Sequence, residues 1–294
     1  MPSSSDDSPG LPSPALASVT PADGLQPLAA QPPAWLRSRT PARVGLRRAG
    51  LGIATDEILD FQLAHARARD AVHAALQPAS LLDQLRTLLA SCNITDAAPI
   101  LLHSAAPDRP AYLQRPDLGR KLDNASRQRL HELPKHAWDL SIVIADGLSA
   151  LAVERNILPL LAGLLPPLSQ QSPEIRLAPI AIVEQARVAI GDEVAHALSA
   201  SLAIVLIGER PGLSSPDSLG AYITWQPRPG ITTDADRNCI SNIRSEGLSY
   251  PQAAARLLHY IHEARSKQLT GIALKDPVLN TPELGPGGPE TIET

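Results

Sequence analysis

The chain has 294 residues, of which 44% are hydrophobic and 19% are charged, so it is long enough to bury one large core or two small ones. Its net charge of -4 argues against a general nucleic-acid-binding protein, and its two distant cysteines argue against a disulfide framework or a cysteine zinc site. No stretch approaches the roughly 20 apolar residues that span a bilayer, so we expect no membrane partner.

Both ends of the chain are expected to be loose. Residues 1–40 are rich in Pro, Ser and Ala and lack a sustained hydrophobic period, which predicts a disordered tail. A targeting role is the alternative, but the segment is not amphipathic and lacks the basic-then-apolar layout of a secretory signal. Residues 276–294 contain four prolines and predict a second loose tail. We therefore expect a cytoplasmic protein whose ordered part lies between these tails.

Residues 41–135 are expected to form a mainly helical N-terminal domain. Thr55 can cap a helix whose first turn holds two acidic residues, which favours the helix dipole. Apolar residues then recur at helical spacing over 58–72 and again over 81–89. The pattern predicts at least two amphipathic helices before the middle of the chain.

From residue 136 onward, strands and helices are expected to alternate. Short β-branched and aliphatic runs predict strands at 141–145, 177–183, 202–207 and 221–225. Ser149 can cap the helix after the first strand, and Pro159 predicts a break in that helix. A last helix is expected over 251–267, with Gly271 at its end. This alternation predicts an α/β fold in which residues 136–275 form a Rossmann-like, mostly parallel sheet domain.

The loops after the first three predicted strands are the expected ligand edge, because open α/β sheets bind ligands beyond the carboxyl ends of their strands. These loops are 146–149, 185–188 and 208–213, and we expect them to lie side by side. The third loop has two glycines next to Glu209 and Arg210. It is either a turn with a local ion pair or a ligand loop in which Glu209 accepts hydrogen bonds from amide or hydroxyl groups.

Several complete catalytic patterns are absent from the sequence. No G-x-G-x-x-G follows a strand and no G-x-x-x-x-G-K-[ST] is present, which argues against a dinucleotide site and a P-loop. His259 and His262 stand one helical turn apart and could bind a metal, but a solvated helix face is the favoured interpretation. Cys239 is more often a small buried hydrophobe than a reactive thiol. We predict no catalytic residues and no metal site in this chain itself.

Five segments carry a resemblance to a known family. They are DFQLAHARARD at 60–70, YLQRPDLGR at 112–120, IADGLS at 144–149, GERPGL at 208–213 and ADRNCISNI at 235–243. In order and approximate spacing they resemble the ethanolamine ammonia-lyase small (light) chain family. The resemblance covers roughly residues 40–275 and leaves out both tails.

The resemblance implies a subunit of an adenosylcobalamin-dependent lyase that converts ethanolamine into acetaldehyde and ammonia. A large subunit would hold the substrate and the adenosyl group, and the small subunit would close over the corrin from the other side. The motifs implied to contact cobalamin contain Val188 (in 186–188), Glu209 (in 208–212) and Cys239 (in 237–241). Two of these, Val188 and Glu209, fall where the sheet rule already expects a ligand.

Further expectations concern the cofactor's base and the assembly. The D-x-H-x-x-G pattern of cobalamin proteins with a histidine lower ligand is absent, so we expect the cobalt to keep its own benzimidazole base. The resemblance implies six copies of each subunit and leaves open encapsulation in a bacterial microcompartment. A scaffold or assembly subunit with no direct cofactor contact is the main alternative. A stand-alone nucleotide-binding enzyme is a weaker one.

Overall fold

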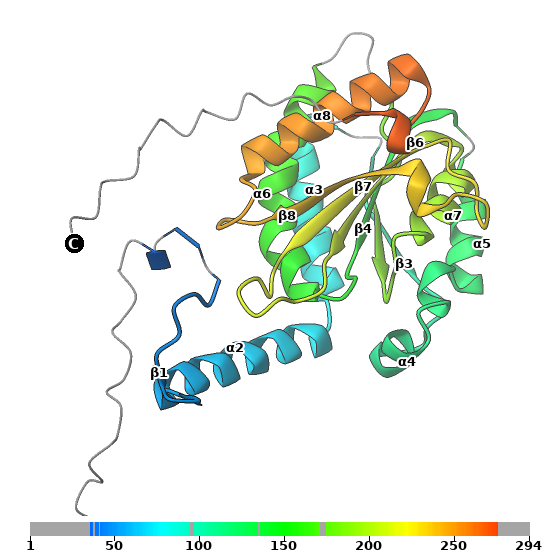
Figure 1. Ribbon diagram of the computed structural model, residues 1–294. Coiled ribbons are helices and arrows are strands. Elements are labelled where there is room, and N and C mark those ends of the chain that lie inside the picture. The colour runs from blue at the N-terminus through cyan, green and yellow to red at the C-terminus, as the bar shows by residue number, and fades with distance from the viewer. Residues whose placement is uncertain are drawn as a thin grey trace, which may run out of the picture. The chain divides into compact units, whose positions relative to one another are not determined.

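The computed structural model describes residues 36–37, 39–40, 42–94, 97–134, 136–170 and 175–275 (Figure 1). Apart from four residues at its end, the tail expected at 1–40 lies outside the described residues, as does the tail expected at 276–294. The chain divides into two compact units between Gln62 and Leu63.

The first unit holds a small hairpin and the beginning of a helix. Strand β1 (Arg48–Ala49) pairs antiparallel with β2 (Gly52–Ile53), and helix α2 (Thr55–His73) follows. The sequence suggested Thr55 as the cap, and it is instead the first helical residue, with Asp56 and Glu57 in the first turn. A guanidinium from Arg37 binds Glu57 at 2.7 Å.

A six-stranded sheet forms the centre of the second unit, in the order β3-β5-β4-β6-β7-β8. The strands are β3 (Ile100–His103), β4 (Trp138–Ala145), β5 (Ala181–Glu184), β6 (Ala200–Gly208), β7 (Leu219–Trp225) and β8 (Arg237–Ile243). The first four in chain order are parallel, whereas β7 and β8 continue the sheet antiparallel from β6. The predicted α/β class with a mostly parallel sheet is confirmed.

Helices cover the two faces of this sheet (Figure 1). The helices after α2 are α3 (Pro78–Ser91), α4 (Arg109–Gln114), α5 (Asn124–Glu132), α6 (Ala150–Ser169), α7 (Ile190–Leu198) and α8 (Tyr250–Lys267), with short 3-10 turns at Leu118–Arg120, Asp234–Asp236 and Gly271–Ala273. The helices α3, α6 and α8 pack on one face, and α5 and α7 pack on the other. Strands β4 and β6 are apolar on both faces because both faces are covered.

Helix α6 is the one helix among the described residues that is long and apolar enough to cross a membrane by length and composition. No stretch long and apolar enough to span a membrane was expected from the sequence. The side chains of Ile157, Leu160 and Leu161 are fully buried in the core cluster that α6 shares with the sheet and α8. Half of the apolar window is buried in this way, as in the core helix of a globular protein.

The break expected at Pro159 is absent, because α6 runs without interruption from Ala150 to Ser169. A proline inside a helix costs about 3 kcal/mol through the lost hydrogen bond and ring clash. Full burial of Leu160 and Leu161 next to it contributes about 1.5–3 kcal/mol for each side chain and offsets that cost. Tertiary packing therefore overrides the local signal.

Two strands of the six-stranded sheet were not expected from the sequence. The range 41–135, expected to be helical, also contributes β3, which pairs in parallel with β5 at the sheet edge. The sheet therefore extends across the predicted boundary between residues 135 and 136. The strand β3 was not predicted because it has only four residues, directly after Pro99, and so short a run shows no hydrophobic period.

The second unexpected strand is β8. Its sequence is polar, and its buried polar side chains are tolerated because each has a hydrogen-bond partner. Arg237 is buried and donates to Asp192 Oδ1 at 2.8 Å and to Oδ2 at 2.7 Å. The Asn238 amide donates to the carbonyls of Gly271 and Leu274. These paired groups replace the apolar alternation by which a strand is recognised in a sequence.

Candidate ligand-binding face

The three loops expected to form a ligand edge do lie side by side at the carboxyl ends of the strands. The Leu148 N–H donates to the Gly208 carbonyl at 2.9 Å, and the Ala186 N–H donates to Asp146 Oδ1 at 3.0 Å. A Cβ built at Gly208 would stand 2.1 Å from the Ser149 carbonyl oxygen. The backbones of the loops after β4 and β6 therefore touch, and only glycine fits there.

The crevice between β4 and β5 is filled by the protein's own side chains. These strands lead to helices on opposite faces of the sheet, which is where α/β folds usually bind ligands. Here Arg109 from α4, only 8% exposed, donates to the Gly147 carbonyl at 2.8 Å and stands 3.4 Å from Asp146 Oδ2. Burial raises the pKa of the Asp146 carboxyl, against the bond from Ala186 and the charge of Arg109. The polar groups of this crevice therefore pair with one another.

The segment 112–120 holds the loop that carries Val188. Tyr112 is fully buried and donates its hydroxyl to the Ala186 carbonyl at 3.1 Å. The Arg187 N–H donates to the Gly119 carbonyl at 2.7 Å, and the Arg187 guanidinium lies 4.5 Å from the Tyr112 ring. This segment is one of the five that resemble the family, and its place in the structure gives it a positioning role.

Replacing Tyr112 by phenylalanine is expected to lower the free energy of unfolding by about 1–2 kcal/mol, because the buried Ala186 carbonyl loses its donor. The urea midpoint of the purified chain measures this change. Tyr250→Phe is the matched control, since its hydroxyl bonds to Asn156 from a half-buried position that water can reach, and a smaller loss is expected. Equal midpoints for wild type and Tyr112→Phe would show that the loop does not depend on this bond.

An open face lies on the α7 side of strands β6, β7 and β8. In register, Val205 pairs with Tyr222, and Tyr222 pairs with Cys239, so the three side chains share one face. Val205 is buried in the cluster that α7 covers, Tyr222 is half-buried, and Cys239 is exposed. The cover provided by α7 therefore reaches Arg237 at the start of β8 but not Cys239, and the part of this face around Cys239 stays accessible.

Glu209 directly follows β6, and its side chain extends over β7 at the edge of this face. Its Oε2 accepts hydrogen bonds from the Ser218 hydroxyl and from the Asn242 N–H, the latter at 3.2 Å. A Cβ at Gly220 would stand 3.0 Å from Glu209 Oε1, so the carboxylate occupies space that the glycine leaves free. Its hydrogen bonds within the described chain go to Ser218 and Asn242, and the alternative of a local ion pair with Arg210 is not found.

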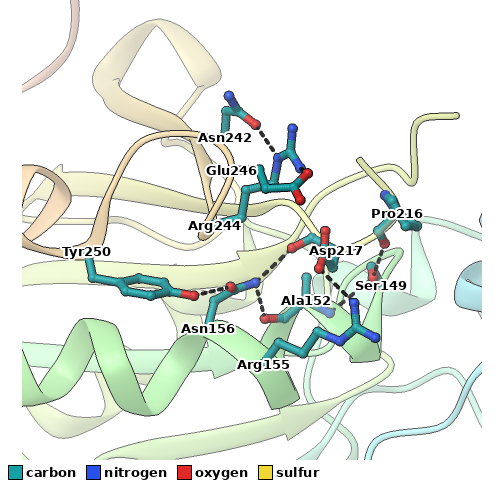
Figure 2. Close-up of polar contacts among 10 residues, drawn as sticks. All are labelled: Ser149, Ala152, Arg155, Asn156, Pro216, Asp217, Asn242, Arg244, Glu246 and Tyr250. Carbon is teal, nitrogen blue, oxygen red and sulfur yellow. Dashed lines mark hydrogen bonds and ion pairs between the residues drawn. The ribbon is translucent and has the colours of Figure 1, made fainter. Parts of the chain in front are cut away.

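The loop between β6 and β7 is fixed to α6, as Figure 2 shows. Asn156 donates to the Asp217 carbonyl at 2.7 Å, and Arg155 binds the Asp217 carboxylate at 2.8 Å. The Ser149 hydroxyl donates to the Pro216 carbonyl at 2.8 Å. Because Ser218 follows directly, these contacts hold the donor of the Glu209 carboxylate in place.

Val188 and Cys239 complete the face. Val188 stands directly before α7, is half-buried, and packs against the cluster that contains Val205. The Cys239 thiol is free and exposed, 3.4 Å from the Ser241 hydroxyl. The structure thus puts Val188, Glu209 and Cys239 on the α7 side of the sheet, although they are spread over 52 positions of the sequence.

Tyr222 lies on the same face as these residues, although it was not among the site residues expected from the sequence. Its ring packs against the same cluster as Val188. Burial raises the pKa of its hydroxyl, and the neighbouring Cys239 and Glu209 raise it further, so the hydroxyl stays a hydrogen-bond donor at neutral pH. Alternation along the predicted strand 221–225 could have revealed it, since Ala221 and Ile223 are buried and Tyr222 faces the other side.

The face offers apolar contact and hydrogen-bonding groups, with one carboxylate at its edge. Within the described ranges, no group of three or more His, Cys, Asp or Glu side chains could hold a metal ion. The arrangement suits a ligand that presents apolar surface and hydrogen-bond donors to the protein.

A family model described as "Ethanolamine ammonia-lyase light chain (EutC)" matches residues 30–275. The ethanolamine ammonia-lyase small subunit of Pseudomonas aeruginosa (strain LESB58) is 54% identical over 247 residues, which cover 82% of this chain and 86% of that protein. The small subunits of Azotobacter vinelandii and Ralstonia nicotianae are 53% and 52% identical, over 82% of this chain and 87% of each relative. The chain belongs to the ethanolamine ammonia-lyase light-chain family.

Proposed function

We propose that this chain is the small subunit of an adenosylcobalamin-dependent ethanolamine ammonia-lyase, which converts ethanolamine into acetaldehyde and ammonia. In this proposal its open face forms one wall of the cobalamin site, within a Rossmann-like α/β fold. The observation that supports it best is the position of Val188, Glu209 and Cys239 on the same side of the sheet, since the family motifs chose these residues without reference to the fold.

The residues on this face fit a corrin. The ring system of cobalamin is largely apolar and carries amide side chains around its rim, so it needs apolar contacts and hydrogen-bond acceptors. Val188 supplies apolar surface, the Glu209 carboxylate can accept from amide N–H groups, and Cys239 supplies a small exposed thiol. When bound, the cofactor supplies radical chemistry through homolysis of its cobalt–carbon bond, while the protein supplies position and electrostatics.

The partner in this proposal is a large subunit that holds ethanolamine and the adenosyl group. The curated relatives are named small subunits, and this name supports a complex of two kinds of chain. We propose six copies of each chain, a cytoplasmic location and, as an open point, encapsulation in a microcompartment. The cobalt keeps its own benzimidazole base, and nitrogen splitting from a protein imidazole in the electron paramagnetic resonance spectrum of the reduced holoenzyme would contradict this.

The decisive test is co-expression with a large subunit. The purified complex should release acetaldehyde only when both ethanolamine and adenosylcobalamin are present. Glu209→Gln should raise the Kd for cobalamin about tenfold, as expected for a lost hydrogen bond to a charged group. Glu132→Gln, an exposed acid on α5, is the matched control and should leave the Kd unchanged. A complex that forms but shows no cofactor-dependent product would contradict the proposal.

A scaffold role is the second candidate, because the Glu209 carboxylate is already bonded to Ser218 and Asn242 within the chain. As a scaffold residue, Glu209 would only join β6 to β8. Glu209→Gln would then lower the urea midpoint of the isolated chain and leave the cobalamin Kd of the assembled complex unchanged. The proposed cofactor role predicts the increase in Kd in a complex that still assembles fully.

A further inference from the structure

We propose that Tyr222 forms the floor of the ligand site, between Glu209 and Cys239, and that a corrin bound to both of these residues lies on its ring. This inference rests on the proposed cobalamin site and adds a binding residue that the family motifs do not contain. The carrying observation is the order of the strands, since β7 lies between β6, which leads into Glu209, and β8, which carries Cys239.

The register places Tyr222 in the direct path between the two residues. It pairs with Cys239 on β8, so these side chains are neighbours on the same face. On the other side, Glu209 continues β6, and its N–H donates to the Ser218 carbonyl at 2.9 Å, which extends the β6–β7 pairing by one more residue. Ser218, Gly220 and Tyr222 are spaced two residues apart, so they lie on the same face of β7 and its extension.

Gly220 joins the carboxylate to the tyrosine. It carries no side chain, and the Glu209 carboxylate lies over it with Oε1 3.0 Å from the position of a Cβ. The next side chain on this face of β7 is Tyr222. Glu209, Tyr222 and Cys239 therefore form a continuous surface, and a ligand that contacts the first and the last must cover the ring in the middle.

The chemistry of the side chain suits this place. Tyr222 is half-buried, so its ring is fixed by packing against the cluster around Val205 while part of it remains accessible. An aromatic ring offers a rigid apolar contact to a corrin. The other described tyrosines do not have this position: Tyr112 and Tyr260 are buried, and Tyr250 lies at the start of α8 on the opposite side of the sheet.

Equilibrium binding of cyanocobalamin to the assembled two-subunit complex tests the inference without measuring turnover. Tyr222→Ile removes the ring and keeps a residue that suits a strand, and we expect its Kd to rise at least fivefold. Tyr222→Phe keeps the ring and should stay within about twofold of wild type. Trp225→Ile, on the same strand but packed on the opposite face of the sheet, is the matched control and should leave the Kd unchanged. Size-exclusion chromatography checks that each variant assembles.

An unchanged Kd for Tyr222→Ile, together with a raised Kd for Glu209→Gln, would overturn the role of Tyr222 and leave the proposed function standing. A wild-type complex that does not bind cyanocobalamin would overturn both. If Tyr222→Ile does not assemble, hydroxyl-radical footprinting of the wild-type complex decides. Saturating cyanocobalamin should protect Tyr222 more than Tyr250, and equal oxidation of Tyr222 with and without cyanocobalamin would contradict the inference.

Discussion

Replacement of Gly208 by alanine is expected to lower the free energy of unfolding by roughly 2–4 kcal/mol. A methyl group there would stand 2.1 Å from the Ser149 carbonyl oxygen and 2.5 Å from that of Asp146, and both are backbone atoms of a loop fixed at each end. The loops after β4 and β6 must separate to admit it. Glu209 is the next residue, so the cobalamin Kd of the complex should rise as well. Urea unfolding of the chain and cobalamin titration of the complex measure the two effects.

Gly163→Ala is the control for this substitution. Gly163 lies inside α6, and a Cβ there would make an ordinary 3.5 Å contact with the Ala254 Cβ. Alanine in this helix should stabilise the chain by roughly 0.5–1 kcal/mol. A Gly208→Ala chain as stable as wild type would mean that the two loops do not touch.

Replacement of Arg237 by methionine is expected to cost about 3–5 kcal/mol, because it leaves the Asp192 carboxylate buried without its partner. Asp192 is 2% exposed, and both of its oxygens accept from the Arg237 guanidinium. The pair joins α7 to β8, the two elements that border the open face. The urea midpoint measures the loss, and cobalamin binding should weaken with it.

A double substitution separates the pair from its surroundings. Arg237→Met combined with Asp192→Leu removes both charges and should recover most of the lost stability. Arg86→Met breaks the exposed contact with Asp83 and should leave the midpoint almost unchanged. If Arg237→Met alone were as mild as Arg86→Met, the pair would not hold α7 to β8.

The elements that the sequence predicted well are those whose apolar pattern reports burial directly. The run at 141–145 lies within β4, the run at 202–207 lies within β6, and the last helix was expected within one residue of its observed start. Its last residue, Lys267, is also the expected one, but Gly271, the residue expected to end the helix, does not do so. Gln268 takes the left-handed conformation after Lys267, and Gly271 lies in a separate 3-10 turn.

The features that the sequence could not reveal depend on contacts between distant segments. The strand β8 is polar because Arg237 and Asn238 find buried partners in α7 and in the turn at Gly271–Ala273. The rule for sheet edges correctly placed the three loops side by side, but it could not show that Arg109 fills the crevice between β4 and β5. The open face on β7 and β8 follows from the register, and register is not readable from one chain.

The most direct measurement is a density map of the assembled complex with adenosylcobalamin bound. We expect the corrin to lie against the α7 side of β6, β7 and β8, with atoms of Val188, Glu209 and Cys239 within about 4 Å of it. A corrin held entirely by the large subunit, or one placed on the side of the sheet covered by α6 and α8, would contradict the account.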